Sequence, residues 1–158
     1  MPTRDEEYMR IAIEMAHASR KDGGAVIGAV LVDTSGKVVA TGESVVGPTH
    51  DPTAHAEVNA IRYASAERGD DDLRDMTLYS TLEPCHMCLS AAAWARIPLV
   101  VFGAYRKDVH HDSYFDMLGN TSDEAEAEKM NIHSHAHMVV KGGVLESECT
   151  DLLYKKLN

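Results

Sequence analysis

The sequence predicts an α/β fold in which a mixed five-stranded sheet is covered by helices on both faces. Two strand-like segments near the start are separated by a short turn, which indicates an antiparallel hairpin. Beyond the hairpin, helical and strand segments alternate to the end of the chain, a pattern typical of parallel strands joined through helices. The chain has no internal repeat and no low-complexity linker, so we expect residues 1–158 to form a single domain.

The first half of the chain supplies a helix, the hairpin and a second helix. Apolar side chains between Asp5 and Ser19 recur every three or four positions, which predicts an amphipathic helix that ends at Lys21-Asp22-Gly23-Gly24. Branched apolar residues predict the two strands of the hairpin, and a proline-containing loop then leads into a segment of helical composition. These three segments are Ala25–Val32, Lys37–Thr41 and Thr53–Glu67.

The second half continues the alternation of strands and helices. A proline at position 84 suits the start of a helix, because its missing N–H would have no partner there. The predicted strands are Met76–Thr81, Pro98–Ala104 and Ile132–Val140. The predicted helices are Cys85–Arg96, Ser113–Leu118, Ser122–Met130 and Leu145–Leu157.

Composition narrows the class of protein. Hydrophobic residues make up 44% and charged residues 25%, as in soluble globular proteins, and no apolar run is long enough to span a bilayer. The first seven residues are charged rather than signal-like, so we expect a cytoplasmic protein. The formal net charge of −10 opposes close approach to a polyphosphate, which favours a small uncharged substrate over nucleic acid.

Two short motifs carry the predicted chemistry. The first is His55-Ala56-Glu57, and the second is Pro84-Cys85-His86-Met87-Cys88; both stand at predicted helix starts. Cys85 and Cys88 are three positions apart, so on a helix they share one face and can bind the same zinc ion, with His55 as the third ligand. Three protein ligands leave one coordination position open, as in catalytic zinc sites. A closed structural site would need a fourth ligand, for which His50 and His86 are the nearest candidates.

Glu57 lies two residues beyond the histidine and is the predicted proton carrier. Zinc lowers the pKa of a bound water to about 7, which makes hydroxide available at neutral pH. The Glu57 carboxylate would accept the water's proton, deliver it to a ring nitrogen and later protonate the leaving amine. The motifs therefore predict one Zn²⁺ per chain and a hydrolytic deamination.

These motifs resemble those of the cytidine and deoxycytidylate deaminase-like zinc deaminase superfamily, and the resemblance covers about residues 11–115. It implies a three-layer α/β/α sandwich and a homodimer. The first motif with the residues around it, together with Trp94-Ala95-Arg96, is most similar to bacterial guanine deaminases. The segments Val101-Phe102-Gly103-Ala104 and 143–149 are more similar to bacterial tRNA wobble-adenosine deaminases.

The same resemblance suggests residues that contact the substrate. His111-Asp112-Ser113-Tyr114-Phe115 is similar to the acidic and aromatic segment of guanine deaminases, in which an aspartate contacts the purine; Asp112 would take that part, with His111, Tyr114 and Phe115 beside the base. Ala56, between the metal ligand and the proton carrier, is a further candidate. Family members usually carry asparagine after the second strand, whereas this chain has Ser44 there, which changes the donors and acceptors offered to a substrate.

Three functions follow from these observations. The first is hydrolysis of a free amino-substituted base, with guanine ahead of cytosine or a related heterocycle. The second is deamination of the wobble adenosine of tRNA, which the C-terminal similarity favours. The third is a zinc-stabilised binding module without activity, which retention of Glu57 argues against because a structural zinc needs no proton carrier.

Predictions can also be made for several residues outside the predicted site. Cys149 is expected to be a small buried hydrophobe, and Trp94 a packing residue. His133, His135 and His137 alternate on a predicted strand, where they would face one way. A solvated surface or an interface is preferred over a second metal as the explanation of that pattern.

Overall fold

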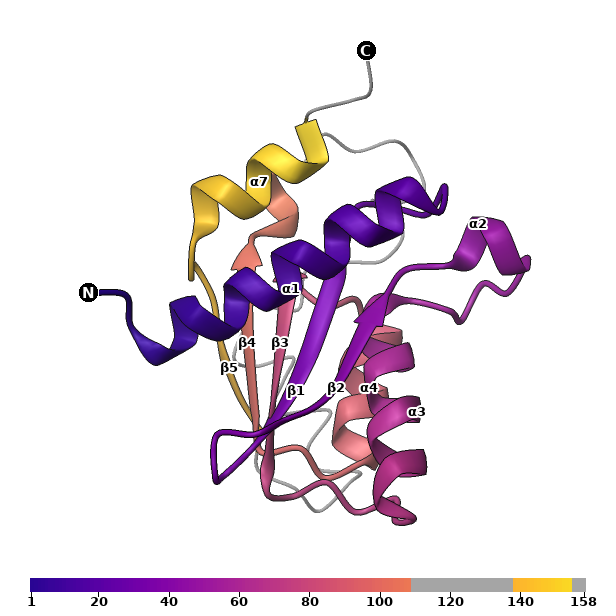
Figure 1. The fold of residues 1–158 in the computed structure, drawn as a ribbon, viewed down its shortest axis with the longest axis vertical. Helices are drawn as coiled ribbons and strands as arrows, with labels where there is room; N and C mark the ends of the chain where they lie inside the picture. Colours follow the sequence, from indigo (N-terminus) through magenta and orange to yellow (C-terminus); the bar gives the residue numbers. More distant parts are fainter. Residues whose placement is uncertain (109–137, 155–158) are drawn as a thin grey trace.

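The computed structural model describes residues 1–108 and 138–154. The helices are α1 Arg4–Lys21, α2 Val46–Thr49, α3 Ala56–Arg68, α4 His86–Trp94 and α7 Glu146–Tyr154, with a 3-10 turn η1 at Arg106–Asp108 (Figure 1). The strands are β1 Gly28–Asp33, β2 Val38–Glu43, β3 Met76–Leu82, β4 Leu99–Ala104 and β5 Val139–Lys141. The two helices predicted between residues 113 and 130 lie outside the described residues, as does most of the strand predicted at 132–140.

The sheet is mixed and five-stranded, as predicted. Its strand order is β2-β1-β3-β4-β5. β1 is antiparallel to both β2 and β3, whereas β3, β4 and β5 run parallel to one another. The hairpin register shifts where Leu31 and Val32 pair with Ala40 and Val38, which leaves Val39 as the extra residue of a bulge in β2. The parallel strands β3 and β4 end at the same edge of the sheet, and the segment that leaves β3 there leads directly into α4.

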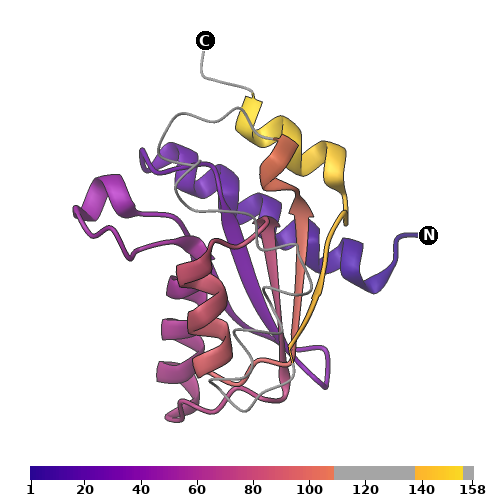
Figure 2. The same cartoon turned by 180° about the vertical axis from the view of Figure 1, so that it is seen from behind.

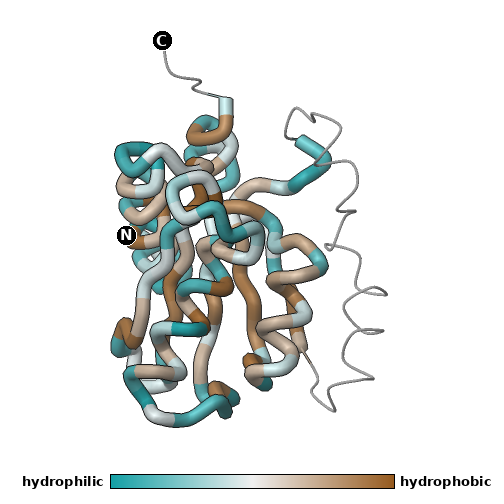
Figure 3. Tube along the Cα trace, turned by 90° about the vertical axis from the view of Figure 1, so that its right-hand side faces the viewer, coloured by the Kyte–Doolittle hydropathy of each residue, from teal (hydrophilic) through white to brown (hydrophobic). Residues whose placement is uncertain are grey.

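Helices cover both faces of the sheet, which confirms the α/β/α layering. Figures 1 and 2 show α1 and α7 against one face and α3 and α4 against the other. One apolar cluster joins α3 and α4 to the sheet through residues such as Ala60 and Leu89, and another joins α1 and α7 to its opposite face through Met9 and Cys149. In Figure 3 the strands inside the molecule are coloured hydrophobic and the surface turns hydrophilic.

Two glycines on adjacent strands bring helices unusually close to the sheet. A Cβ placed on Gly42 would lie 2.0 Å from the carbonyl oxygen of Ala56, at the start of α3. A Cβ placed on Gly28 would lie 2.0 Å from the carbonyl oxygen of Ala12, in α1 on the opposite face. Only a residue without a side chain fits at either position, so these glycines set the depth at which α1 and α3 pack.

Some boundaries differ from the prediction for local reasons. The first strand begins at Gly28 rather than Ala25, because the Ala25 carbonyl is used by a tight turn from Ile27 and by the hydroxyl of Ser19. The loop that contains Pro48 includes a single helical turn, α2, that closes with His50 in the left-handed conformation. None of the helices within residues 1–108 and 138–154 is long and apolar enough to cross a membrane.

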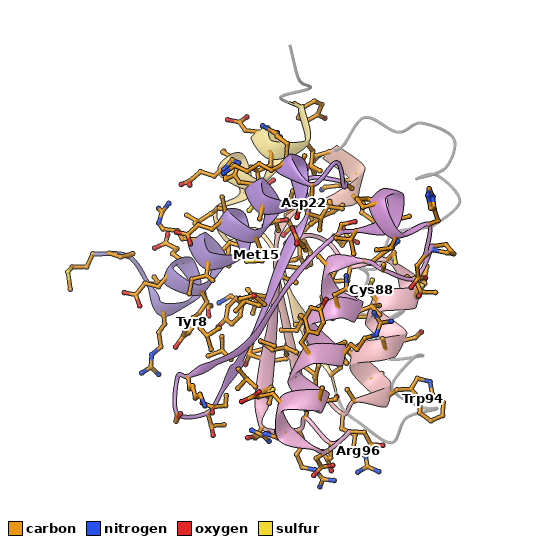
Figure 4. The ribbon with its side chains drawn as sticks, turned by 45° about the vertical axis from the view of Figure 1, so that its right-hand side comes forward. Tyr8, Met15, Asp22, Cys88, Trp94 and Arg96 are labelled. Atoms are coloured by element: carbon orange, nitrogen blue, oxygen red, sulfur yellow. The ribbon has the colours of Figure 1, made fainter. Side chains whose placement is uncertain are left out.

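One packing prediction is confirmed and another is wrong. Cys149 is fully buried, with its sulfur against the backbone of Gly103, as expected for a small hydrophobe. Trp94 was expected to pack but is 83% exposed, because it stands at the last position of α4 on the side away from the sheet (Figure 4).

Candidate active site

The predicted metal ligands meet where two helices begin. His55 is the N-terminal cap of α3 and Cys85 is the N-terminal cap of α4, and Cys88 lies in the first turn of α4. Figure 4 shows Cys88 at the opposite end of α4 from Trp94. Helix N-termini carry partial positive charge, which stabilises thiolates placed there. The local sequence thus builds a site for anionic sulfur ligands before any metal is considered.

The three side chains have the spacing of a tetrahedral metal site. The sulfur atoms of Cys85 and Cys88 are 3.6 Å apart, and His55 Nδ1 lies 3.6 Å from the first and 3.4 Å from the second. Tetrahedral zinc with ordinary bond lengths requires about 3.8 Å between two sulfurs and about 3.6 Å between sulfur and nitrogen. The donor set and its spacing therefore fit zinc.

Within the part of the chain that the structure describes, only these three residues form a group able to hold a metal. The alternatives for a fourth ligand, His50 and His86, are not part of that group. His50 is exposed at the end of α2, and His86 is the first residue of α4. The cluster of His55, Cys85 and Cys88, called the metal cluster below, thus matches the open three-ligand pattern better than a closed structural site.

The pKa values of the three metal-cluster side chains are shifted by their contacts with one another. Hydrogen bonding with Cys88, and then with His55, lowers the pKa of the Cys85 thiol to about 3 although burial opposes the change. The hydrogen bond with Cys85 and burial raise the pKa of Cys88, and the hydrogen bond with Cys85 raises the pKa of His55. Zinc binds cysteine as the thiolate, so both sulfurs would be deprotonated in the metal-loaded protein.

Glu57 stands beside the metal cluster with its two oxygens in different surroundings. The residue is 4% exposed, in the first turn of α3. Its Oε2 lies 3.4 Å from the sulfur of Cys88, and its Oε1 accepts a hydrogen bond from Ser80 at 2.8 Å. A carboxylate so placed can exchange protons with a group bound next to the metal cluster. Ser80 was missed by the sequence reasoning, although a serine on a strand face lined with apolar residues is a signal of a buried polar contact.

Ala56 and Ser44 stand differently with respect to the metal cluster. Ala56 is fully buried at the start of α3, between His55 and Glu57. Ser44 is 3% exposed and is linked to this corner through its neighbour, because Val45 N donates to the carbonyl of Ala54, directly before His55, at 3.0 Å. A contact between either residue and the substrate stays a prediction.

Asn59 holds this corner together and was also missed by the sequence reasoning. Its Nδ2 donates to the carbonyl of Glu43 at 2.9 Å and to that of Ala54 at 3.3 Å. Its Oδ1 accepts from Arg62 at 2.8 Å. One side chain of α3 thereby ties the end of β2 to the residue that precedes His55.

Two buried charged residues, Glu83 and Arg106, hydrogen-bond to each other close before Cys85 in the fold. Glu83 Oε2 accepts from the backbone N–H of Arg106 at 3.0 Å, and Arg106 Nε donates to the carbonyl of Glu83 at 3.0 Å. Both residues are almost fully buried. The pKa of His55 is raised, mainly by its hydrogen bond with Cys85, and the Arg106 charge opposes that rise, so this guanidinium is within electrostatic reach of the site. The pair fixes the segment between β3 and α4 that carries Cys85.

Four predicted substrate contacts lie outside the described residues: His111, Asp112, Tyr114 and Phe115. His110 and the three alternating histidines at 133, 135 and 137 do so as well. The part of the site that the structure describes is thus the metal cluster, Glu57 and the Ser44–Ala56 corner.

Comparison with known proteins agrees with this geometry. Residues 2–104 match the family described as "Cytidine and deoxycytidylate deaminase zinc-binding region". The chain is 39% identical over 157 residues to the chloroplastic tRNA(adenine(34)) deaminase of Arabidopsis thaliana, which covers 96% of this chain but only 12% of that protein. It is 39% identical over 112 residues to the guanine deaminase of Bacillus subtilis, which covers 70% of this chain and 71% of that enzyme.

A solved structure is also similar over nearly the whole chain. It comes from a study of A-to-I editing by tRNA:A34 deaminases at the wobble position of transfer RNA, and it superposes with a TM-score of 0.77 at 32% identity. The match covers 93% of this chain and 99% of that one. Sequence, fold and the spacing of the three metal-binding side chains lead to the same conclusion: the chain belongs to the cytidine and deoxycytidylate deaminase family of zinc-binding proteins.

Proposed function

We propose that this protein hydrolytically deaminates an amino-substituted nucleobase, with His55, Cys85 and Cys88 as zinc ligands and Glu57 as the proton carrier. The observation that carries the proposal is the buried Glu57 carboxylate, whose Oε2 lies 3.4 Å from a sulfur of the metal cluster. A metal site that served only the fold would gain nothing from a buried acidic group beside its ligands. Burial of a carboxylate costs free energy, and a site that served only the fold would have no reason to incur that cost.

The reaction replaces a ring C–NH₂ by C=O, consumes one water and releases ammonia. Zinc bound to the metal cluster would activate that water as the nucleophile. Glu57 accepts a proton from the water on the oxygen that faces the metal cluster and passes it to a ring nitrogen of the base. It then takes the second proton, from the hydroxyl now bonded to the ring carbon, and delivers it to the amino group, which leaves as ammonia as the C–O bond becomes a carbonyl.

The preferred substrate in this proposal is a free base, with guanine first and cytosine or a related aminated heterocycle next. The net charge of −10 supports it, because a polyanionic substrate would be repelled over long range. The similarity to the Bacillus subtilis guanine deaminase over 70% of the chain supports it as well. Asp112, outside the described residues, would accept hydrogen bonds from the N–H and amino edge of guanine.

The wobble adenosine of tRNA is the second candidate. It is favoured by the extent of the match to the tRNA:A34 deaminase structure, which covers 93% of this chain. The two candidates differ in what the enzyme must recognise. A free base offers only its ring edges, whereas a tRNA offers phosphates that need cationic partners.

The test is ammonia release by the zinc-loaded protein from guanine, cytosine, adenine, their nucleosides and a tRNA anticodon stem-loop. Turnover of guanine or another free base, lost in Glu57→Gln, is the expected result. Turnover of the stem-loop alone would replace the free-base proposal with the tRNA candidate. If nothing is turned over and metal removal unfolds the protein, the chain is a zinc-stabilised binding module instead.

Three further properties belong to the same proposal. We expect one domain over residues 1–158 and a homodimer, with one zinc ion in each protomer. Metal analysis combined with light scattering during size-exclusion chromatography measures the zinc content and the oligomeric state on the same sample. A monomer, or a ratio other than one zinc per chain, would contradict the respective expectation.

A further inference from the structure

Ser80 is a buried hydroxyl in the middle of the sheet, on β3. It is fully buried, and it pairs with Ala29 of β1 on one side and Phe102 of β4 on the other. The apolar cluster on the α3 side of the sheet contains Leu78 of the same strand, two residues away, and Ala29. A hydroxyl among such neighbours costs free energy unless it is hydrogen-bonded, so its partners explain why it is there.

The Ser80 hydroxyl contacts two oxygen atoms. Its Oγ lies 2.8 Å from the backbone carbonyl oxygen of Leu82 and 2.8 Å from Oε1 of Glu57. A hydroxyl has one hydrogen, so it donates to one of these oxygens at a time. Because Leu82 belongs to the same strand, its carbonyl fixes Oγ relative to the sheet. The hydroxyl is thus a fixed point on β3 that reaches across to a side chain of α3.

This contact distinguishes the two oxygens of Glu57. Oε1 is directed to Ser80, and Oε2 is directed to the sulfur of Cys88, 3.4 Å away. A glutamate side chain has three rotatable bonds, and one contact alone would leave the carboxyl group free to turn. We propose that Ser80 is a positioning residue for the deamination: it holds Oε1 and thereby keeps Oε2 facing the metal cluster. This inference rests on the proposed action of Glu57 as proton carrier.

Kinetics of Ser80→Ala test the proposal on whichever base the wild type turns over. Loss of a hydrogen bond to a charged group predicts a fall in kcat of about 10- to 100-fold, because the Glu57 carboxyl group is no longer held with Oε2 facing the metal cluster. KM should change by less than about twofold and zinc content should be unchanged, since the Ser80 hydroxyl is bonded to Glu57 and the Leu82 carbonyl rather than to a metal ligand. Ser80→Thr keeps the hydroxyl and should recover most of the lost kcat.

Thr81→Val is the matched control. Thr81 is the next residue of β3, is equally buried, and its Oγ1 accepts a hydrogen bond from the backbone N–H of Gly28 rather than from the site. This variant removes a buried hydroxyl of the same strand while Glu57 keeps its partner. Its kcat should stay within about threefold of wild type. An equal fall in both variants, or an unchanged kcat in Ser80→Ala, would overturn the proposal.

A second measurement needs no substrate and keeps the two proposals separable. The melting temperature is measured for wild type, Ser80→Ala, Glu57→Ala and the double variant. If Ser80 holds Glu57, Ser80→Ala lowers the melting temperature by about 2–4 °C more when Glu57 is present than when it is absent. Additive shifts would overturn the positioning inference. If the melting temperatures are non-additive but the protein turns over no base, the contact between Ser80 and Glu57 is confirmed and the proposed function is refuted.

Discussion

Replacement of Gly42 by alanine should damage the active site through the backbone alone. The added Cβ would lie 2.0 Å from the carbonyl oxygen of Ala56 and 2.7 Å from the amide nitrogen of Ala60, so it meets only main-chain atoms of α3. Ordinary contacts begin near 3.4 Å, so the start of α3 must withdraw from β2 by about 1.4 Å. The residues that flank Ala56 are the ligand His55 and the proton carrier Glu57.

The expected cost has two parts. Forced repacking of this size destabilises a protein by about 1–3 kcal/mol, offset in part by the lower entropy of the unfolded alanine chain. A displacement of about 1 Å at reacting groups lowers catalysis by about 100-fold. We therefore expect Gly42→Ala to lose about 100-fold in kcat/KM, with weakened zinc affinity, while chemical denaturation shows that most molecules remain folded.

Gly28→Ala is the matched control for this prediction. Its Cβ would meet the carbonyl oxygen of Ala12 at the same 2.0 Å, but Ala12 belongs to α1 on the opposite face of the sheet. We expect a similar loss of stability and a kcat/KM within about fivefold of wild type, once activity is corrected for the folded fraction. Equal losses of activity in the two variants would refute the reasoning, and so would full activity in Gly42→Ala.

Three further outcomes are expected. Glu57→Gln should keep zinc and the fold but lower turnover by at least about 100-fold, the scale of general acid–base catalysis; full activity would discard the proposed mechanism. Asp112→Ala should lower kcat/KM for the preferred base by about 1.5–3 kcal/mol with unchanged zinc content, whereas zinc loss would place Asp112 in the metal shell instead of the pocket. Asp5 bears on acid stability: burial raises its pKa, but hydrogen bonds from Lys141 and Tyr79 outweigh it and the net pKa is lowered. A lowered pKa contributes stability that is present above the unfolded value of 3.8 and is lost as pH falls through the folded value. Urea unfolding between pH 6 and pH 2 should therefore show a shallower acid loss in Asp5→Asn than in wild type, and parallel curves would contradict this.

The metal ligands were accessible from sequence because their spacing is itself the signal. Two cysteines three positions apart at a helix start can face one ion whatever the rest of the fold does, and the structure brings His55 to them. Hydrophobic periodicity was equally sufficient for α1 and for the strands of the sheet. Such features can be predicted from sequence because they depend only on residues that are close together along the chain.

Ser80 and Asn59 could not be assigned in this way. The partner of Ser80 is 23 positions away on another element, and the importance of Asn59 comes from two backbone carbonyls that meet only when β2 and α3 pack. Trp94 shows the opposite error, since an aromatic residue was assigned to packing although the end of α4 leaves it exposed. Pairings across the fold, rather than residue types, were the missing information.

The sheet divides the molecule into a working side and a supporting side. The metal cluster and Glu57 lie with α3 and α4, whereas α1 and α7 pack on the opposite face and are joined at the surface by an ion pair between Arg10 and Glu148. The supporting side is therefore the place to engineer this protein. Thermostabilising substitutions, immobilisation chemistry or solubility changes introduced on α1 and α7 would be separated from the reaction by the full thickness of the sheet.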